Sequence, residues 1–235
     1  MFTNFFYPRR SFDPESLELM DRPQPVSPEL QIDLKNLEKL NRYFGSHALV
    51  LRFLKRWART GESVRIIDLC TGFGDIPRRM VDWCRKNAVT VRIAAVDSQA
   101  ATLKLAETTG YPEISFVRAD VFEFEEPADL VFCSLALHHF SDDKASELMR
   151  RIKQMASRAA LISDLERTDL GILGIQLLTA TVFREPMTVY DARLSIRRAF
   201  SFREMRRLAE KAGWERFGHA RFPVCRQAIW TETRK

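Results

Sequence analysis

Cysteine is scarce in this 235-residue chain, and its four cysteines are far apart, with no Cys-x-x-Cys pair. Three of them fall within apolar patterns, so we expect buried thiols rather than disulfides or metal ligands. This expectation favours a reducing, cytoplasmic environment and predicts no bound metal. The first ten residues contain no apolar core long enough for a signal peptide, and no run approaches the ~20 apolar residues of a transmembrane helix.

Acidic residues are scarce in the C-terminal third. Residues 150–235 carry 18 Lys and Arg against 9 Asp and Glu, whereas residues 1–149 carry 19 against 22. The basic excess could attract an acidic substrate, a membrane surface or RNA, or it could belong to solvated arginines on helices and hairpin strands. One alternative therefore stays open: a non-catalytic module that binds RNA or a protein partner through this basic part. We do not expect DNA as a partner.

Strands and helices alternate from residue 64 onward. Short apolar runs predict strands at 64–68, 91–97, 114–120, 128–137 and 159–166, with helical patterns between them. Two further strands, near 214–222 and 226–233, predict an antiparallel closing hairpin. The alternation predicts an α/β fold with a seven-stranded, mostly parallel sheet and helices on both faces. We expect Asp142 or Asp143 to cap the helix after the fourth strand, and Ser201 with Glu204 to form a capping box on the last helix.

Three segments are expected outside this sheet: an N-terminal arm, two helices and an insertion. Residues 1–27 predict an irregular arm that either docks by its aromatic side chains, Phe2, Phe5, Phe6 and Phe12, or is partly disordered. The domain then spans residues 28–235 and begins with two helices over residues 28–60. Residues 167–200 form an insertion after the fifth strand.

The insertion contains an uncharged stretch over residues 170–183. As a helix it would span ~21 Å, which is short of the ~30 Å hydrocarbon core of a bilayer. We predict a buried lid helix that lines an apolar acceptor pocket. A homodimer interface and contact with a membrane surface are the alternatives.

The sequence VRIIDLCTGFGDIPRR (64–79) combines a buried strand, a glycine turn and the start of an amphipathic helix. Asp75, at the start of that helix, is placed to accept hydrogen bonds from free backbone N–H groups. The G-x-G-x-x-G turn of dinucleotide-binding proteins would need glycine where this chain has Pro77. Asp68, at the strand end, would disfavour a pyrophosphate and would suit an ammonium group. The ligand of this turn is therefore not expected to be a dinucleotide.

The pattern D-x-x-x-G-x-G at the end of a first strand resembles the cofactor motif of class I S-adenosylmethionine (SAM)-dependent methyltransferases. Cys70 stands where the usual motif has a glycine. The resemblance covers residues 60–235 in order and implies a Rossmann-like fold that binds SAM.

The resemblance also implies the roles of the strand ends. Asp97 would bind both ribose hydroxyls, and Asp120 with Val121 would contact the adenine amino group and ring. The full set of cofactor-binding residues implied in this way is Asp68, Cys70, Thr71, Gly72, Gly74, Asp97, Ser98, Asp120, Val121, Ser134 and Leu135.

The loop after the fourth strand, SLALHHF, has neither the N/D-P-P-aromatic motif nor the Pro-Cys pair of base-methylating enzymes. It resembles the loop of small-molecule methyltransferases. His138 and His139 are candidate general bases, because a hydroxyl acceptor must lose its proton as it attacks the methyl group. The alternative for each histidine is a packing or backbone-bonding role. Candidate acceptor-binding residues are Asp164, Arg167, Tyr190 and Arg197.

Together these features predict a methyltransferase that acts on a small, largely apolar acceptor. We expect O-methylation of a hydroxyl or phenol in secondary or quinone-like metabolism, in preference to methylation at carbon or nitrogen.

Overall fold

The computed structural model describes residues 8–233. Its helices are α1 (Pro28–Tyr43), α2 (Ser46–Trp57), α3 (Asp75–Lys86), α4 (Ala100–Glu107), α5 (Asp142–Met155), α6 (Asp169–Thr181), α7 (Pro186–Arg198) and α8 (Phe202–Lys211). Two short 3-10 helices are η1 (Leu19–Asp21) and η2 (Leu137–His139). The strands are β1 (Ser63–Leu69), β2 (Thr90–Asp97), β3 (Ile114–Arg118), β4 (Ala128–Ser134), β5 (Ala156–Leu165), β6 (Gly218–Phe222) and β7 (Arg226–Glu232).

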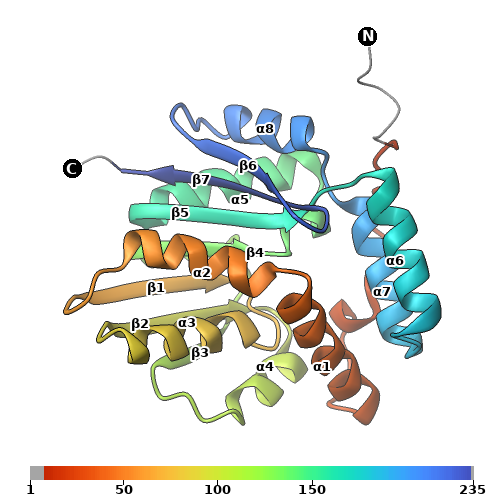
Figure 1. Ribbon diagram of the computed structural model, residues 1–235, viewed down its shortest axis with the longest axis horizontal. Coiled ribbons are helices and arrows are strands. Elements are labelled where there is room, and N and C mark those ends of the chain that lie inside the picture. The colour runs from red at the N-terminus through yellow and green to blue at the C-terminus, as the bar shows by residue number, and fades with distance from the viewer. Residues whose placement is uncertain (1–7, 234–235) are drawn as a thin grey trace.

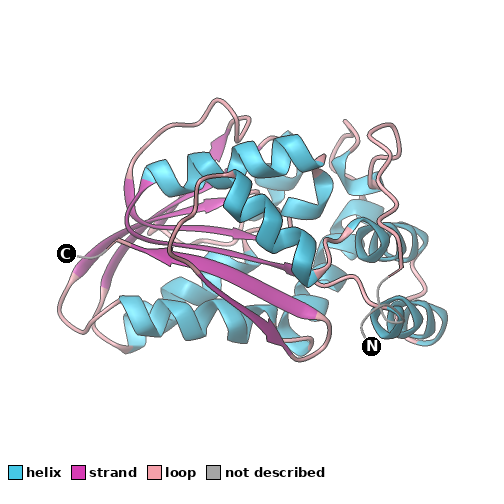
Figure 2. Ribbon diagram, turned by 90° about the horizontal axis from the view of Figure 1, so that it is seen from above, coloured by secondary structure: helices cyan, strands magenta, loops and turns pink. Residues whose placement is uncertain are grey.

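The seven strands form one sheet in the order β3-β2-β1-β4-β5-β7-β6. The first five strands pair in parallel, whereas β7 is antiparallel to both β5 and β6. Helices cover both faces of the sheet (Figures 1 and 2). The predicted α/β, Rossmann-like sheet with its closing hairpin is therefore confirmed.

Two hydrophobic cores lie on opposite faces of the sheet, and both draw on the central strands. Alternate residues of β1 divide between them: Ile67 and Leu69 belong to one core, and Val64 and Ile66 belong to the other. The first core packs against α5 and α8, and the second packs against α2 and α3. Because both faces are covered, the last four residues of β1 and the last five of β4 are all buried, as expected for parallel strands.

The helix ends follow local capping chemistry. Ser201 and Glu204 form the predicted capping box on α8. The cap of α5 is different from our prediction: the side chain of Ser141 accepts from the backbone N–H of Lys144, and Asp142 and Asp143 occupy the first turn. A serine in extended backbone directly before the helix fills the cap position, which leaves both aspartates inside the helix.

Helices α1, α6 and α7 lie together beyond the carboxyl ends of the parallel strands, at the right of Figure 1. Helix α7 contacts both α1 and α6. These helices cover the carboxyl ends of the strands with largely apolar side chains, and a cavity lies between the helices and the sheet.

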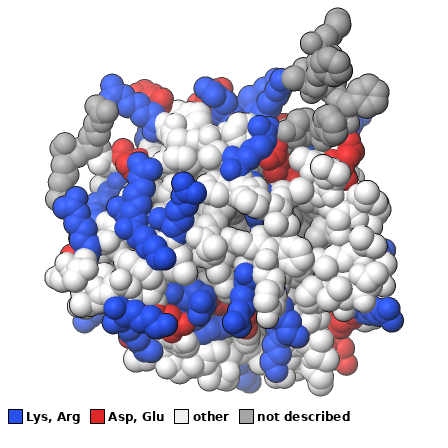
Figure 3. All heavy atoms as spheres, viewed as in Figure 1, with Lys and Arg blue, Asp and Glu red and all other residues white. Residues whose placement is uncertain are grey.

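Helix α6 is less buried than expected for the predicted lid helix. Leu170, Leu173 and Leu177 are 62–70% exposed, and only Gly171 and Thr179 are buried. The same part of the molecule is mostly free of charged side chains in Figure 3. Helix α6 covers a cavity with one face and exposes the other. An uncharged sequence does not distinguish such a helix from one that is buried on all sides. None of the helices within residues 8–233 is long and apolar enough to cross a membrane.

The described part of the arm, residues 8–27, docks mainly through polar groups. Arg10 donates to the carbonyl oxygens of Phe140 and Arg198, at 2.8 and 2.6 Å, and lies over the ring of Phe200. The backbone N–H groups of Leu19 and Met20 donate to the carboxylate of Asp191 on α7. Phe12 takes part by packing under the Arg10 guanidinium. The predicted contacts of Phe2, Phe5 and Phe6 lie outside the described residues.

Candidate active site

A cavity of about 770 Å³ opens at the carboxyl ends of the parallel strands. Its walls come from the arm, α1, the turn after β1, the loops after β2, β3 and β4, and helices α6 and α7. In open parallel sheets this edge is where ligands bind, because the loops that follow neighbouring strands converge there.

The glycine turn follows β1 at the floor of the cavity. Gly72 has a φ of +55°, and a Cβ atom built there would meet nothing within 4 Å, so its backbone is open to a ligand. Gly74 instead allows close packing on β3, because a Cβ there would lie 2.8 Å from the ring of Phe116. Gly74 does not line the cavity, unlike Gly72.

Cys70 adopts a φ of +56°, the left-handed conformation that favours glycine. The chain therefore keeps the backbone shape of the usual glycine motif with a cysteine in its place. The thiol of Cys133 and burial raise the pKa of Cys70 well above its ordinary value. A neutral thiol at this position suits packing rather than nucleophilic chemistry.

Asp68 lines the cavity and is almost fully buried. The hydroxyl of Thr71 donates to its carboxylate at 2.6 Å. Burial, reinforced by the nearby Asp75 and Asp97, raises the pKa of Asp68 to about 7, against the opposing effect of the Thr71 hydrogen bond. A buried carboxylate of this kind favours a cationic partner such as an ammonium group.

Asp97 also lines the cavity, next to Ser98. Its two carboxylate oxygens accept from the backbone N–H groups of Gly72 and Gln99, at 2.8 and 2.9 Å. Burial raises its pKa, and these backbone hydrogen bonds oppose the shift. Each carboxylate oxygen has a second lone pair, so Asp97 can still accept from two neighbouring hydroxyls.

Two further loops complete the wall around the turn. Asp120 and Val121 line the cavity after β3, and Asp120 accepts from the backbone N–H of Phe122. Ser134 and Leu135 line it after β4, where the backbone N–H of Leu135 donates to the carbonyl oxygen of Ser163. The structure thus brings the predicted cofactor residues together around one open glycine turn, with Gly74 set back behind it.

His138 is buried in the loop after β4 and is fixed by Asp164 at the end of β5. Its Nδ1 lies 2.7 Å from Asp164 Oδ1, and its backbone N–H donates to Asp164 Oδ2 at 3.0 Å. Because a carboxylate accepts hydrogen bonds, Nδ1 carries a proton and Nε2 points away from β5. Asp164 itself does not line the cavity, so it positions His138 rather than touching an acceptor.

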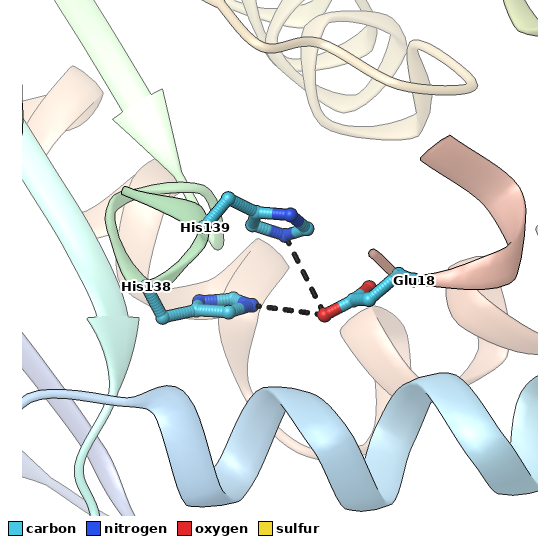
Figure 4. Close-up of side chains that lie close together, drawn as sticks. All are labelled: Glu18, His138 and His139. Atoms are coloured by element: carbon cyan, nitrogen blue, oxygen red, sulfur yellow. Dashed lines mark ion pairs between the residues drawn. The ribbon is translucent and has the colours of Figure 1, made fainter. Parts of the chain in front are cut away.

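His139 faces the arm. Its Nδ1 lies 2.8 Å from Asp21 Oδ2, and its Nε2 lies 3.7 Å from Glu18 Oε1. His138 Nε2 lies 3.6 Å from the same Glu18 oxygen, so both rings point at one carboxylate (Figure 4). That oxygen also accepts from the hydroxyl of Ser195 on α7, at 2.6 Å.

The charges of this cluster are strongly coupled. Burial opposes the charged form of His139, but Glu18 and Asp21 outweigh it and raise the pKa of His139 to about 10. Burial likewise opposes ionisation of Glu18, but the two histidines and Ser195 lower its pKa to about 2. The pKa of His138 is also raised, since Asp164 outweighs burial. At neutral pH Glu18 is therefore an anion and His139 a cation, and Asp164 favours the cationic form of His138.

The other predicted acceptor-binding residues lie away from the cavity wall. Arg167 is buried, and its guanidinium donates to the carbonyl oxygens of Pro8 and Ala199 and to Glu204. Tyr190 is 40% exposed, and Arg197 is exposed on α7. Neither lines the cavity, so these side chains do not meet an acceptor bound within it.

The part of the cavity beneath α1, α6 and α7 is instead apolar. Its walls include Leu34 and Leu37 of α1, Phe44 directly after α1, Ile175 and Leu178 of α6, and Ile196 of α7. Asp75 also reaches the cavity, but it does not cap α3: it accepts from Asn41 at 3.0 Å and contacts His47 Nε2 at 2.6 Å. These two contacts, from Asn41 of α1 and His47 of α2, tie both helices to α3, which follows the glycine turn.

Glu18 and Asp21 are the functional candidates that sequence reasoning missed. They lie in an irregular, proline-rich arm more than 110 residues from the histidines, and no local periodicity marks them. The one signal was their charge: they are two of the four acids in an arm that was expected to dock by aromatic side chains.

Residues 66–158 match the sequence model of a family described as a methyltransferase domain. No curated protein sequence matches the chain. Among solved structures, the plantazolicin methyltransferase BpumL in complex with SAH is 12% identical, with a TM-score of 0.65 over 88% of this chain and 91% of that one.

Two other solved structures are similar across most of the chain. Human N-acetylserotonin methyltransferase in complex with SAM is 17% identical, with a TM-score of 0.62 over 87% of this chain and 55% of that one. Magnesium protoporphyrin IX methyltransferase (ChlM) from Synechocystis PCC 6803, with SAH bound, is 14% identical, with a TM-score of 0.55 over 90% of each chain. At these identities the likeness shows a shared fold.

Proposed function

We propose that this chain, which has the class I, Rossmann-like methyltransferase fold and a segment that matches the methyltransferase-domain model, uses SAM to methylate a hydroxyl or phenol oxygen of a small, largely apolar acceptor. A role in secondary or quinone-like metabolism would fit such an acceptor. The observation that carries the proposal is the buried cluster of Glu18, His138 and His139 on the wall of the cavity.

The donor chemistry at one end of the cavity supports SAM as its ligand. Gly72 leaves backbone open to a close ligand, and Asp68 offers a buried carboxylate to an ammonium group. Asp97 offers two oxygens to vicinal hydroxyls, and Asp120 with Val121 would hold the adenine ring. When bound, SAM supplies an electrophilic methyl group on a sulfonium that leaves without acid assistance.

The acceptor end supports an apolar molecule with one polar end. Leucine, isoleucine and phenylalanine side chains of α1, α6 and α7 would cover its body and exclude water. Ordering the acceptor oxygen against the methyl group can contribute ~7–11 kcal/mol at best, so positioning would supply much of the rate.

The histidine cluster would act on the acceptor oxygen. With its pKa near 10, His139 keeps its proton at neutral pH, which differs from the unprotonated base expected from the sequence. It would therefore donate a hydrogen bond to the acceptor oxygen and stabilise it as an oxyanion. The acceptor proton then goes to solvent. His138, held by Asp164, would fix the loop that carries His139.

The test separates chemistry from cofactor binding. We expect His139→Ala to slow methyl transfer at saturating SAM while leaving the affinity for S-adenosylhomocysteine (SAH) within about twofold. We expect Asp97→Ala to weaken SAH binding by about tenfold or more, through loss of hydrogen bonds to the ribose. Unchanged turnover in His139→Ala with a hydroxylated acceptor that the wild type methylates would remove the proposed role.

A further inference from the structure

In the histidine cluster, the Nδ1 atoms (the outer contacts) are hydrogen-bonded to carboxylates, whereas the Nε2 atoms (the inner contacts) face Glu18 without a hydrogen bond. His138 Nδ1 and His139 Nδ1 lie 2.7 and 2.8 Å from their carboxylate partners, which are ordinary hydrogen-bond distances. The Nε2 atoms lie 3.6 and 3.7 Å from Glu18 Oε1, beyond hydrogen-bond range. Both rings thus point across a gap at the same oxygen (Figure 4).

This spacing suits a metal ion. The three inner ligand atoms lie within 4.8 Å of one another. Zinc bonds of about 2.1 Å at tetrahedral angles would place ligand atoms about 3.4 Å apart. The two gaps to Glu18 would contract by only a few tenths of an ångström, and the two Nε2 atoms, which lie within 4.8 Å of each other, would move together as the metal binds.

The outer carboxylates have the arrangement that supports histidine ligands. In metal sites the second ring nitrogen of a ligating histidine commonly donates to a carboxylate, which fixes the ring and its tautomer. Asp164 does this for His138 and Asp21 does it for His139. Glu18 and His138 are buried, and the side chain of His139 is 22% exposed.

We propose that Glu18, His138 and His139 bind a first-row divalent cation of the Zn²⁺ or Fe²⁺ class through Oε1 and the two Nε2 atoms. Two imidazoles and one carboxylate are a donor set these cations prefer. Three carboxylates around two imidazoles also give the site a negative charge that a divalent cation offsets. No metal was expected from the sequence, because the third ligand comes from the arm.

The cation would serve the proposed methylation, and this part rests on the proposed function. Glu18, His138 and His139 all line the cavity, so a cation bound by them would lie within reach of an acceptor there. An acceptor hydroxyl bound there would release its proton to solvent, and its oxygen would form the bond to the transferred methyl group as the methyl–sulfur bond breaks. The cation would replace the imidazole protons as the positive charge beside that oxygen.

The test is direct metal binding by the full-length protein. After removal of metals with a chelator, calorimetric titration with Zn²⁺ is expected to show one site per chain. We expect Glu18→Gln to weaken that site by about 100-fold and Asp21→Asn, which loses only the support of His139, by about tenfold. Glu15→Gln, an exposed glutamate in the same arm, is the matched control and should bind Zn²⁺ like the wild type.

SAH affinity is measured for every variant, and unchanged SAH binding shows that the variant is folded. The proposal is overturned if the wild type binds no Zn²⁺. It is also overturned if Glu18→Gln and Asp21→Asn both bind Zn²⁺ as tightly as the wild type, because the ion is then held elsewhere. If Zn²⁺ does not bind but His139→Ala still slows methyl transfer selectively, the metal site fails and the proposed function stands.

Discussion

The raised pKa of Asp68 predicts that cofactor affinity depends on pH near neutrality. The buried Asp68 carboxyl has a pKa of about 7 in the free protein. An ammonium group requires the ionised form, so the affinity is present above this pKa and is lost as the pH falls through it.

The size of the effect follows from the ionised fraction. With a pKa of about 7, this fraction falls about 25-fold between pH 7.5 and pH 5.5, which corresponds to ~1.9 kcal/mol of binding free energy. The pKa of Asp97 is also raised, and its protonation would act in the same direction. The range stops at pH 7.5 because most of the Asp68 carboxyl is already ionised there.

Calorimetry with SAH over this range measures the effect. Asp68→Asn is the control. It should bind SAH weakly at pH 7.5, and its SAH affinity should depend much less on pH than that of the wild type. A wild-type affinity that changes less than about threefold, together with an unweakened Asp68→Asn variant, would refute the assignment of Asp68 to the cofactor ammonium group.

Three other substitutions test the framework of the site. Gly74→Ala should cost about 1–3 kcal/mol more than Gly61→Ala by thermal unfolding, because both have positive φ but only Gly74 would clash with a ring, that of Phe116. Arg10→Ala should cost about 2–4 kcal/mol, because it removes the charged hydrogen bonds that dock the arm on carbonyl oxygens. Gly174→Phe, where a Cβ meets open space on the cavity wall, should raise the KM of the acceptor and leave SAH affinity unchanged.

Much of the fold could be predicted from the sequence because its signals are local. Strand β1 carries apolar residues that pack on both faces of the sheet, and α8 is marked by a capping box and a strongly amphipathic pattern. The cofactor end of the site was predictable for a related reason. Acids at the ends of successive parallel strands must meet at one edge of the sheet, whatever the loops do.

The acceptor end could not be predicted in the same way, because long-range contacts decide it. Arg167 and Asp164 are charged residues at a strand end, but each is buried against partners far away in the sequence. Glu18 reaches the histidines because contacts far apart in the sequence, among them those of Asp191 and Ser195 of α7, hold the arm in place. The expectation that helix α6 is buried was wrong because it relied on composition. Composition shows that a helix is apolar but does not show which of its faces packs against other elements.

The most direct test of the central claim is a crystal structure of the protein with SAH bound. We predict the amino group of SAH at Asp68, its ribose hydroxyls at Asp97, its chain along Gly72 and its sulfur facing His139 across the cavity. SAH bound elsewhere, or with its sulfur turned away from the cluster of Glu18, His138 and His139, would contradict the account.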